Sequence, residues 1–162
     1  MTRKAFYSFH YEPDNSRVAQ IRSAGLIEGN RPVADNAWEE VKRGGKPAIK
    51  RWIDGQLAGK SVAIVMIGSG TAGRPWINYE IEKAWTDGKG VFGIHIHGLK
   101  NLAGQQSAKG ANPFAGILLP DGRRLSTLTK VYDPPYTESK NVYAYIAQNL
   151  SAWVETAIGD RR

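Results

Sequence analysis

The segment SVAIVMI, residues 61–67, decides the fold. Its residues after Ser61 are all apolar, on both parities, and the run is too short for a typical buried helix. Such a run predicts a central strand of a parallel sheet with both faces covered. A loop with three glycines follows, and Pro75 then suits the first turn of a helix that we expect to extend to about Thr86.

Strand-like and helix-like segments alternate along the rest of the chain. Further strands are expected at residues 5–9, 90–96 and 125–132, with a short second strand within 25–46. Further helices are expected from Asp14 as N-cap to Gly25, from Pro47 to Leu57, and over 142–157 with Gly159 as the stop. The alternation predicts one α/β domain over residues 1–162, with a mainly parallel central sheet of about five strands and helices on both faces.

Ligands of open parallel sheets bind beyond the carboxyl ends of the strands. In this chain that edge is expected to carry Phe9-His10-Tyr11, Gly68-Ser69 and His95–Gly98. Residues 98–124 are expected to form a long glycine-rich loop, and loops of such length are commonly functional or poorly ordered.

The composition excludes several classes of site and location. The 162 residues include no cysteine, which removes disulfides, thiolate nucleophiles and cysteine metal sites. No apolar run approaches the roughly 20 residues that span a bilayer, and the N-terminus lacks the long apolar stretch of a signal peptide. We therefore expect a cytoplasmic protein with no membrane partner.

The formal net charge is +7, from 22 basic and 15 acidic residues. The basic residues are scattered, and their densest clusters are only pairs: Lys42-Arg43, Lys50-Arg51, Arg123-Arg124 and Arg161-Arg162. A nucleic-acid interface would concentrate them on one face. The pattern favours a solvated surface or a general attraction for phosphorylated small molecules, and nucleic acid is not an expected partner.

The loop after residue 67 contains Gly68-x-Gly70-x-x-Gly73, the spacing of a dinucleotide-binding fingerprint. In that fingerprint the third glycine lies inside the helix, and an acidic residue about 20 positions later binds the ribose. Here Arg74-Pro75 places the helix after the motif, and the corresponding later position is Gly93, in a predicted strand. The glycines are therefore interpreted as a flexible turn rather than a Rossmann fingerprint.

The helix after this loop has one apolar face, made by Ile77, Ile81, Ala84 and Trp85. Trp76 and Glu80 lie on the flank of that face, with Lys83 close by. Spacing leaves two interpretations open. Glu80 is either an exposed helix glutamate supported by Lys83, the commoner arrangement, or a partly desolvated and sharply positioned carboxylate against an indole.

Several short motifs carry a resemblance to a known family. They are Phe6-Tyr-Ser-Phe-His-Tyr11, Trp38-Glu39, Ile67-Gly-Ser69, Arg74-x-Trp76-x-x-x-Glu80-Ile81, Gly93-Ile-His-Ile96 and Lys109-Gly-x-Asn-Pro-Phe114. In order and spacing they resemble the TIR-like domain of bacterial Thoeris antiphage proteins of the ThsB type, over about residues 4–115. The remainder matches only as a strand and a final helix. The Trp-x-x-x-Glu pair recurs in TIR domains that cleave NAD.

The resemblance implies a flavodoxin-like TIR fold and an enzyme that breaks the bond between nicotinamide and ribose in NAD. Thoeris members make a cyclic or otherwise rearranged ADP-ribose signal when phage infection is sensed, and the diffusible signal activates a separate effector. NAD is then the substrate, and no cofactor or metal is expected. Further expected partners are other copies of the chain, through TIR surfaces, and a phage-derived trigger protein.

The same resemblance favours a catalytic Glu80, whose carboxylate would stabilise or trap the cation that forms on the ribose. The residues expected to bind the substrate are Phe9, His10, Tyr11, Trp38, Ser69 and Trp76. His95 and His97 share a strand face but lack a third ligand for zinc. Asn112-Pro113-Phe114 is expected to fix a loop turn or a contact between protomers.

Three rival functions stay open at this point. The first is a TIR interaction module without activity, in which Glu80 is only surface charge. The second is an enzyme like the nucleoside deoxyribosyltransferases, which share the sheet topology and place a carboxylate on a sugar. The third is binding of nucleic acid to the basic surface, which would show steep salt dependence. The acceptor that traps the ribosyl cation is also open: water, a ribose or adenine group, or a free amino acid such as histidine.

Overall fold

The computed structural model describes residues 3–29 and 41–162. Its strands are β1 (Lys4–Ser8), β2 (Glu28–Gly29), β3 (Val62–Ile67), β4 (Gly90–His95) and β5 (Lys130–Tyr132). Its α-helices are α1 (Tyr11–Ser23), α3 (Gly45–Leu57), α4 (Pro75–Thr86) and α5 (Ser139–Gly159), with short 3-10 helices at Pro113–Gly116 and Leu125–Thr127. None of these helices is both long and apolar enough to cross a bilayer.

The strands form one sheet in the order β2-β1-β3-β4-β5, and every pair is parallel. This arrangement confirms the predicted flavodoxin-like fold. Strand β3 is central, as its sequence predicts, and all six of its residues are buried. Because the strands are parallel, all their carboxyl ends meet at one edge, which is where the candidate functional residues gather.

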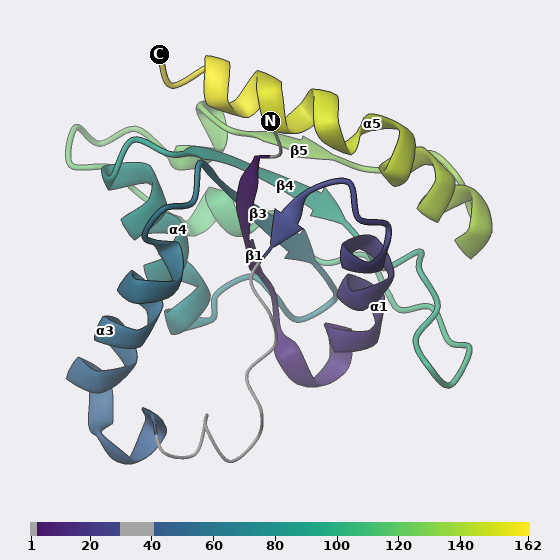
Figure 1. Cartoon of the computed structure of the whole chain (residues 1–162), viewed down its shortest axis with the longest axis horizontal. Coiled ribbons are helices and arrows are strands. Elements are labelled where there is room, and N and C mark those ends of the chain that lie inside the picture. Colours follow the sequence, from purple (N-terminus) through teal and green to yellow (C-terminus); the bar gives the residue numbers. More distant parts are fainter. Residues whose placement is uncertain (1–2, 30–40) are drawn as a thin grey trace.

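Helices cover both faces of the sheet, with α3 and α4 on one side and α1 and α5 on the other (Figure 1). Alternation along the strands divides their side chains between these faces. In β1, Phe6 packs with the α3 and α4 side, whereas Ala5 and Tyr7 pack with the α1 and α5 side. Ser8 has the parity of Phe6 and therefore faces α4.

Several predicted boundaries are wrong. Helix α3 begins at Gly45 rather than Pro47, and α5 begins at Ser139 and includes Gly159, the residue predicted to be its stop. Helix α1 begins at Tyr11 rather than after Asp14, because His10 takes the N-cap position and Asp14 lies inside the helix as a buried residue. The predicted strand over 125–132 is reduced to its last three residues, because Leu125–Thr127 turns into a 3-10 helix whose Leu125 fills the core. Gly25 does follow α1 with a φ of 69°, which confirms its predicted role as the stop.

Arg161 fastens the chain end to the body of the domain. Its guanidinium donates hydrogen bonds to the carbonyls of Lys89 (2.9 Å) and Trp85 (2.9 Å), and it lies 3.6 Å from the centroid of the Trp85 ring. It thereby links the segment after α5 to the last turn of α4 and to the residue before β4.

We expect Arg161→Ala to lower the free energy of unfolding by about 1–3 kcal/mol, since two charge-assisted hydrogen bonds and the ring contact are lost together. Urea denaturation of both proteins measures this change. Arg162→Ala is the matched control, because Arg162 is exposed and its side chain has no described partner. Equal losses in the two variants would contradict a specific role for Arg161.

Candidate functional site

The centre of the candidate site is a hydrogen bond between β1 and α4. The Ser8 hydroxyl donates to Glu80 Oε1 at 2.8 Å, across 72 positions of sequence. Ser8 is buried at the carboxyl end of β1, and Glu80 is half-buried on the sheet-facing flank of α4. The contact therefore places one carboxylate at the ligand-binding edge of the sheet, with a fixed partner.

Helix α4 holds Glu80 in this position for local reasons. Ile77, Ile81 and Ala84 anchor one face of the helix in the core. Glu80, directly before Ile81, therefore lies on the flank of that face. The Tyr79 hydroxyl donates to Asp54 of α3 at 2.7 Å and braces α4 from the other side.

Lys83 does not support Glu80. Its ammonium group pairs with Asp87 at 3.1 Å, one helical turn further along α4. The interpretation of Glu80 as an exposed glutamate stabilised by Lys83 is therefore wrong. The structure supports the alternative of a partly desolvated, positioned carboxylate.

Burial raises the pKa of Glu80 from its ordinary 4.5 to about 8, while the hydrogen bond from Ser8 acts in the opposite direction. The cause is desolvation, which disfavours the charged carboxylate. A carboxyl group whose pKa lies close to neutral pH changes its charge readily when a cation arrives, which is a property of functional sites.

Ser8→Ala tests this electrostatic arrangement. The hydroxyl stabilises the charged form of Glu80, so its removal should raise the pKa of Glu80 further, by about one unit. We consider the NAD cleavage that the sequence leads us to expect. If the Glu80 carboxylate is the active form in that reaction, its kcat/KM in the parent rises with pH through a midpoint near 8, and Ser8→Ala moves that midpoint upward. A pH–rate profile measures the shift, with the exposed Ser151→Ala as control. A midpoint that stays in place or moves down would contradict the assignment.

Two of the three glycines in the loop after β3 have a structural cause. A Cβ atom on Gly68 would collide with the Asp14 carboxylate, and one on Gly70 would approach His10 Nδ1 and the Arg74 guanidinium. Gly73 has a φ of 83°, which favours glycine. Helix α4 begins at Pro75, beyond the motif. Close packing thus explains Gly68 and a left-handed turn explains Gly73, whereas a Cβ atom on Gly70 would make only ordinary contacts. The start of α4 beyond the motif supports the rejection of a Rossmann fingerprint.

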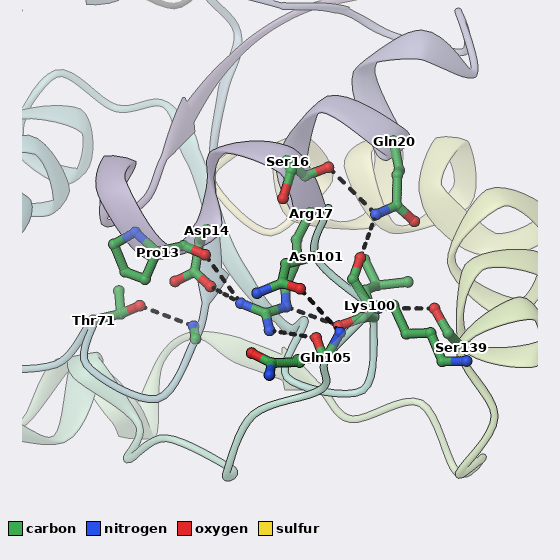
Figure 2. Close-up of polar contacts among 12 residues, drawn as sticks. Pro13, Asp14, Ser16, Arg17, Gln20, Thr71, Lys100, Asn101, Gln105 and Ser139 are labelled. Atoms are coloured by element: carbon green, nitrogen blue, oxygen red, sulfur yellow. Dashed lines mark hydrogen bonds and ion pairs between the residues drawn. The ribbon is translucent and has the colours of Figure 1, made fainter. Parts of the chain in front are cut away.

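A buried ion pair lies behind this loop. Arg17 Nη1 and Asp14 Oδ1 are 2.9 Å apart, and their side chains are only 4% and 2% exposed. Arg17 also donates to the carbonyls of Leu99 (2.8 Å) and Gln105 (2.8 Å), so it fastens the loop after β4 to α1 (Figure 2). The same loop continues to Gly110, whose backbone abuts the Gly68 carbonyl.

The predicted substrate-binding residues divide between the two sheet faces. Trp76 packs half-buried on the α4 face, with its ring edge toward Tyr79 at 6.0 Å. Phe9 packs on the opposite face and stacks on Tyr11, with ring centroids 6.1 Å apart. The rings of Phe9 and Tyr11 therefore lie at the start of α1.

His10 and Ser69 lie at the same carboxyl edge. Ser69 is exposed directly after β3. His10 is half-buried beside Gly70, and its Nδ1 is buried without a hydrogen-bond partner. Burial, followed by the nearby Arg74 charge, lowers the pKa of His10, so its imidazole is neutral at pH 7. Trp38 lies outside the described residues.

Two surface hollows of the described part of the chain lie away from Glu80. One lies at the amino ends of the strands, between Trp85 and Arg161, and the other lies between Gln20 of α1 and Tyr143 of α5. Within residues 3–29 and 41–162, no three histidine or acidic side chains group as metal ligands.

Sequence reasoning assigned no role to Ser8, Asp14 as an ion-pair partner, or Arg17. Ser8 could have been found from alternation in β1, since it shares the parity of Phe6 and is a polar residue at the end of a buried strand. No local signal identifies Arg17, because an arginine in a helix ordinarily lies on the solvent side.

The comparisons with known proteins agree with this geometry. The family described as Thoeris protein ThsB, TIR-like domain, matches residues 6–101, which include the end of β1 and all of β3, α4 and β4. A curated relative from Bacillus cereus (strain MSX-D12), described as "Putative cyclic ADP-D-ribose synthase ThsB1", is 38% identical over 119 residues. The match covers 70% of this chain and 62% of that relative, so the chain spans less than two thirds of the relative's length. With more than half of its residues matched, this chain belongs to the ThsB TIR-like family.

Proposed function

We propose that the chain is an enzyme that cleaves the nicotinamide–ribose bond of NAD and forms a cyclic or conjugated ADP-ribose signal for an antiphage effector. The observation that carries this proposal is the Glu80 carboxyl group, half-buried at the carboxyl edge and bonded to Ser8 at 2.8 Å. Membership of the ThsB TIR-like family supports the substrate class, as does the activity named for the relative.

Cleavage of the nicotinamide–ribose bond needs the charged carboxylate form of Glu80 rather than a proton donor. Nicotinamide leaves NAD as a neutral molecule from a cationic ring, so no proton donor is required. Positive charge then develops on the ribose, as in glycoside hydrolysis. Glu80 can stabilise that cation, hold ribose hydroxyls or attack the anomeric carbon.

The raised pKa of Glu80 fits a substrate whose reacting ring is cationic. In the protein without substrate, the Glu80 carboxyl group is largely protonated at pH 7, since burial raises its pKa to about 8. A pyridinium ring nearby favours the charged carboxylate, because opposite charges stabilise each other in a poorly solvated site. Substrate binding would therefore release a proton and place the carboxylate beside the forming ribosyl cation. Exclusion of water would favour cyclisation or transfer over hydrolysis.

The test follows NAD and its products. Purified protein is incubated with NAD, with and without lysate of phage-infected cells, and nicotinamide release and new ADP-ribose species are followed by mass spectrometry. Nicotinamide release with a rearranged ADP-ribose product supports the proposal. Exchange of bases on deoxynucleosides without loss of NAD would instead support a deoxyribosyltransferase. Intact NAD under every condition would support the interaction module.

A further inference from the structure

A second group of polar side chains lies at the carboxyl ends of β4 and β5. It consists of His95, His97, Ser107, Lys109 and Asp133, and we name it the His95 cluster. Ile94 pairs with Tyr132 in the parallel register, so the residues that follow them, His95 and Asp133, are also neighbours. Alternation places both on the sheet face covered by α4, where Gly93 meets Val131.

Short contacts hold the cluster together. The rings of His95 and His97 meet edge to face with centroids 5.7 Å apart. The Ser107 amide donates to the His97 carbonyl at 3.0 Å, which folds the loop back over β4. Lys109 Nζ lies 2.7 Å from Asp133 Oδ2, and this partly exposed pair spans the outer side of the cluster.

The inner side has unused hydrogen-bonding capacity. His95 is only 5% exposed. Its Nδ1, the His97 Nδ1 and the Ser107 hydroxyl are all buried, and none has a partner among the described residues. Buried polar atoms without partners cost free energy, and most native proteins avoid them unless a ligand or water uses them.

The chemistry of the cluster suits an anion. Burial lowers the pKa of His95, so this imidazole is neutral at pH 7 and offers one N–H donor and one acceptor. Lys109 adds an ammonium group. Asp133 balances the Lys109 charge, and an arriving phosphate would compete with Asp133 for that ammonium group.

The cluster is contiguous with the Glu80 site. Ser8 pairs with Val65 of β3, and His95 pairs with Ile67, two residues further along the same strand. Two strand spacings and two residue steps separate Ser8 from His95 by roughly 12 Å. Gly110, next to Lys109, abuts the Gly68 carbonyl between them. One extended molecule can therefore reach both places.

We propose that the His95 cluster binds a phosphate group of the dinucleotide substrate. This phosphate lies beyond the ribose on which Glu80 acts. This inference rests on the proposed function for the identity of the substrate. It assigns Lys109 and His97 as direct phosphate contacts, with His95 behind them.

The test measures binding without reaction. Calorimetry on the whole chain gives Kd for ADP-ribose, inorganic pyrophosphate and adenosine, and NMR follows the imidazole signals of the three histidines. ADP-ribose and pyrophosphate should shift the His95 and His97 signals, whereas adenosine should not. Lys109→Met and His97→Gln should each weaken ADP-ribose binding at least about 10-fold.

Lys130→Met is the matched control. Lys130 forms a similarly exposed ion pair with Asp160 at the opposite end of β5, and its loss should change Kd less than about 2-fold. Equal effects of Lys109→Met and Lys130→Met would show general charge attraction and overturn the proposal. Unmoved histidine signals would also overturn it, since they would leave the buried atoms to water alone. A shift caused equally by adenosine would point to base binding and likewise overturn it.

Glu80→Gln separates this inference from the proposed function. If Glu80→Gln still binds ADP-ribose as tightly as the parent, the phosphate site stands whether or not NAD is cleaved. If NAD cleavage depends on Glu80 but Lys109→Met binds ADP-ribose normally, the function stands and the phosphate site is wrong.

Discussion

Glu80→Gln is expected to slow nicotinamide release from NAD by at least about 100–1,000-fold. The amide keeps the shape of the side chain and accepts the Ser8 hydrogen bond, but it cannot stabilise positive charge on the ribose. Loss of one well-placed electrostatic contact to a transition state commonly costs about 3–4 kcal/mol, which corresponds to this range. Nicotinamide release under activating conditions measures the change.

Glu82→Gln is the matched control for this substitution. Glu82 lies on the same helix, two residues along, and is exposed. It should retain the activity of the parent. Equal rates for Glu80→Gln and the parent would show that Glu80 is not catalytic, and equal losses for both variants would show that only the charge of α4 matters.

Glu80→Gln should also increase the stability of the protein at alkaline pH. The folded protein raises the pKa of Glu80 to about 8, so between pH 4.5 and 8 the folded state binds more protons than the unfolded state. Stability is therefore lost as pH rises through this window, and the loss is complete above it. Glu80→Gln removes this penalty and should raise Tm at pH 8.5 relative to the parent, while the two proteins should be similar at pH 4.5. A lower Tm at both pH values would indicate a structural role instead.

Arg17→Met is expected to lower the free energy of unfolding by about 3–5 kcal/mol at pH 7. The change leaves the buried Asp14 carboxylate without its cation, and removal of one partner from a buried ion pair has effects of this size. It also removes the hydrogen bonds that Arg17 donates to the carbonyls of Leu99 and Gln105. For a chain of this length, Tm should fall by about 6–20 °C, which thermal denaturation measures.

Arg3→Met is the control for loss of an ordinary ion pair. Arg3 and Glu155 are 37% and 54% exposed, so this pair should contribute at most about 1 kcal/mol. If Arg17→Met does not fold, Asp14→Asn with Arg17→Met removes both charges and should recover part of the loss. A double variant as unstable as Arg17→Met alone would show that the carbonyl contacts, not the charge, dominate.

The pH dependence of Arg17→Met offers a second check. Burial already raises the pKa of Asp14, and Arg17 opposes that rise. Without Arg17 the pKa of Asp14 should be higher, so the variant gains protons on folding and loses stability as pH increases. Its deficit relative to the parent should therefore be smaller at pH 5 than at pH 8.

Local patterns were sufficient for most of the fold. The apolar run at residues 62–67 became the buried centre of the sheet, and Pro75–Thr86 became α4 at the predicted bounds. These features depend on short-range preferences: apolar periodicity, a proline at the first helical turn and a left-handed glycine at Gly25. The position of Glu80 on the flank of α4 follows from the same 3.6-residue period.

Contacts between distant segments decided the rest. Ser8 reaches Glu80 across 72 positions, and Arg17 reaches Leu99 and Gln105 across 82 and 88 positions. Strand order and the closure of long loops bring these groups together. The local sequence preferences of the two partners do not predict such a contact. Asp14 shows the consequence, since its residue type suggests a helix cap, yet the approach of Gly68 and Arg17 buries it.

The periodicity of the chain thus establishes a parallel α/β domain with a glutamate at the border of one helix. The assembled sheet establishes what that glutamate can do, because desolvation and the Ser8 hydroxyl set its pKa. Desolvation is a sum over every neighbouring group in three dimensions, and a one-dimensional pattern does not contain that sum.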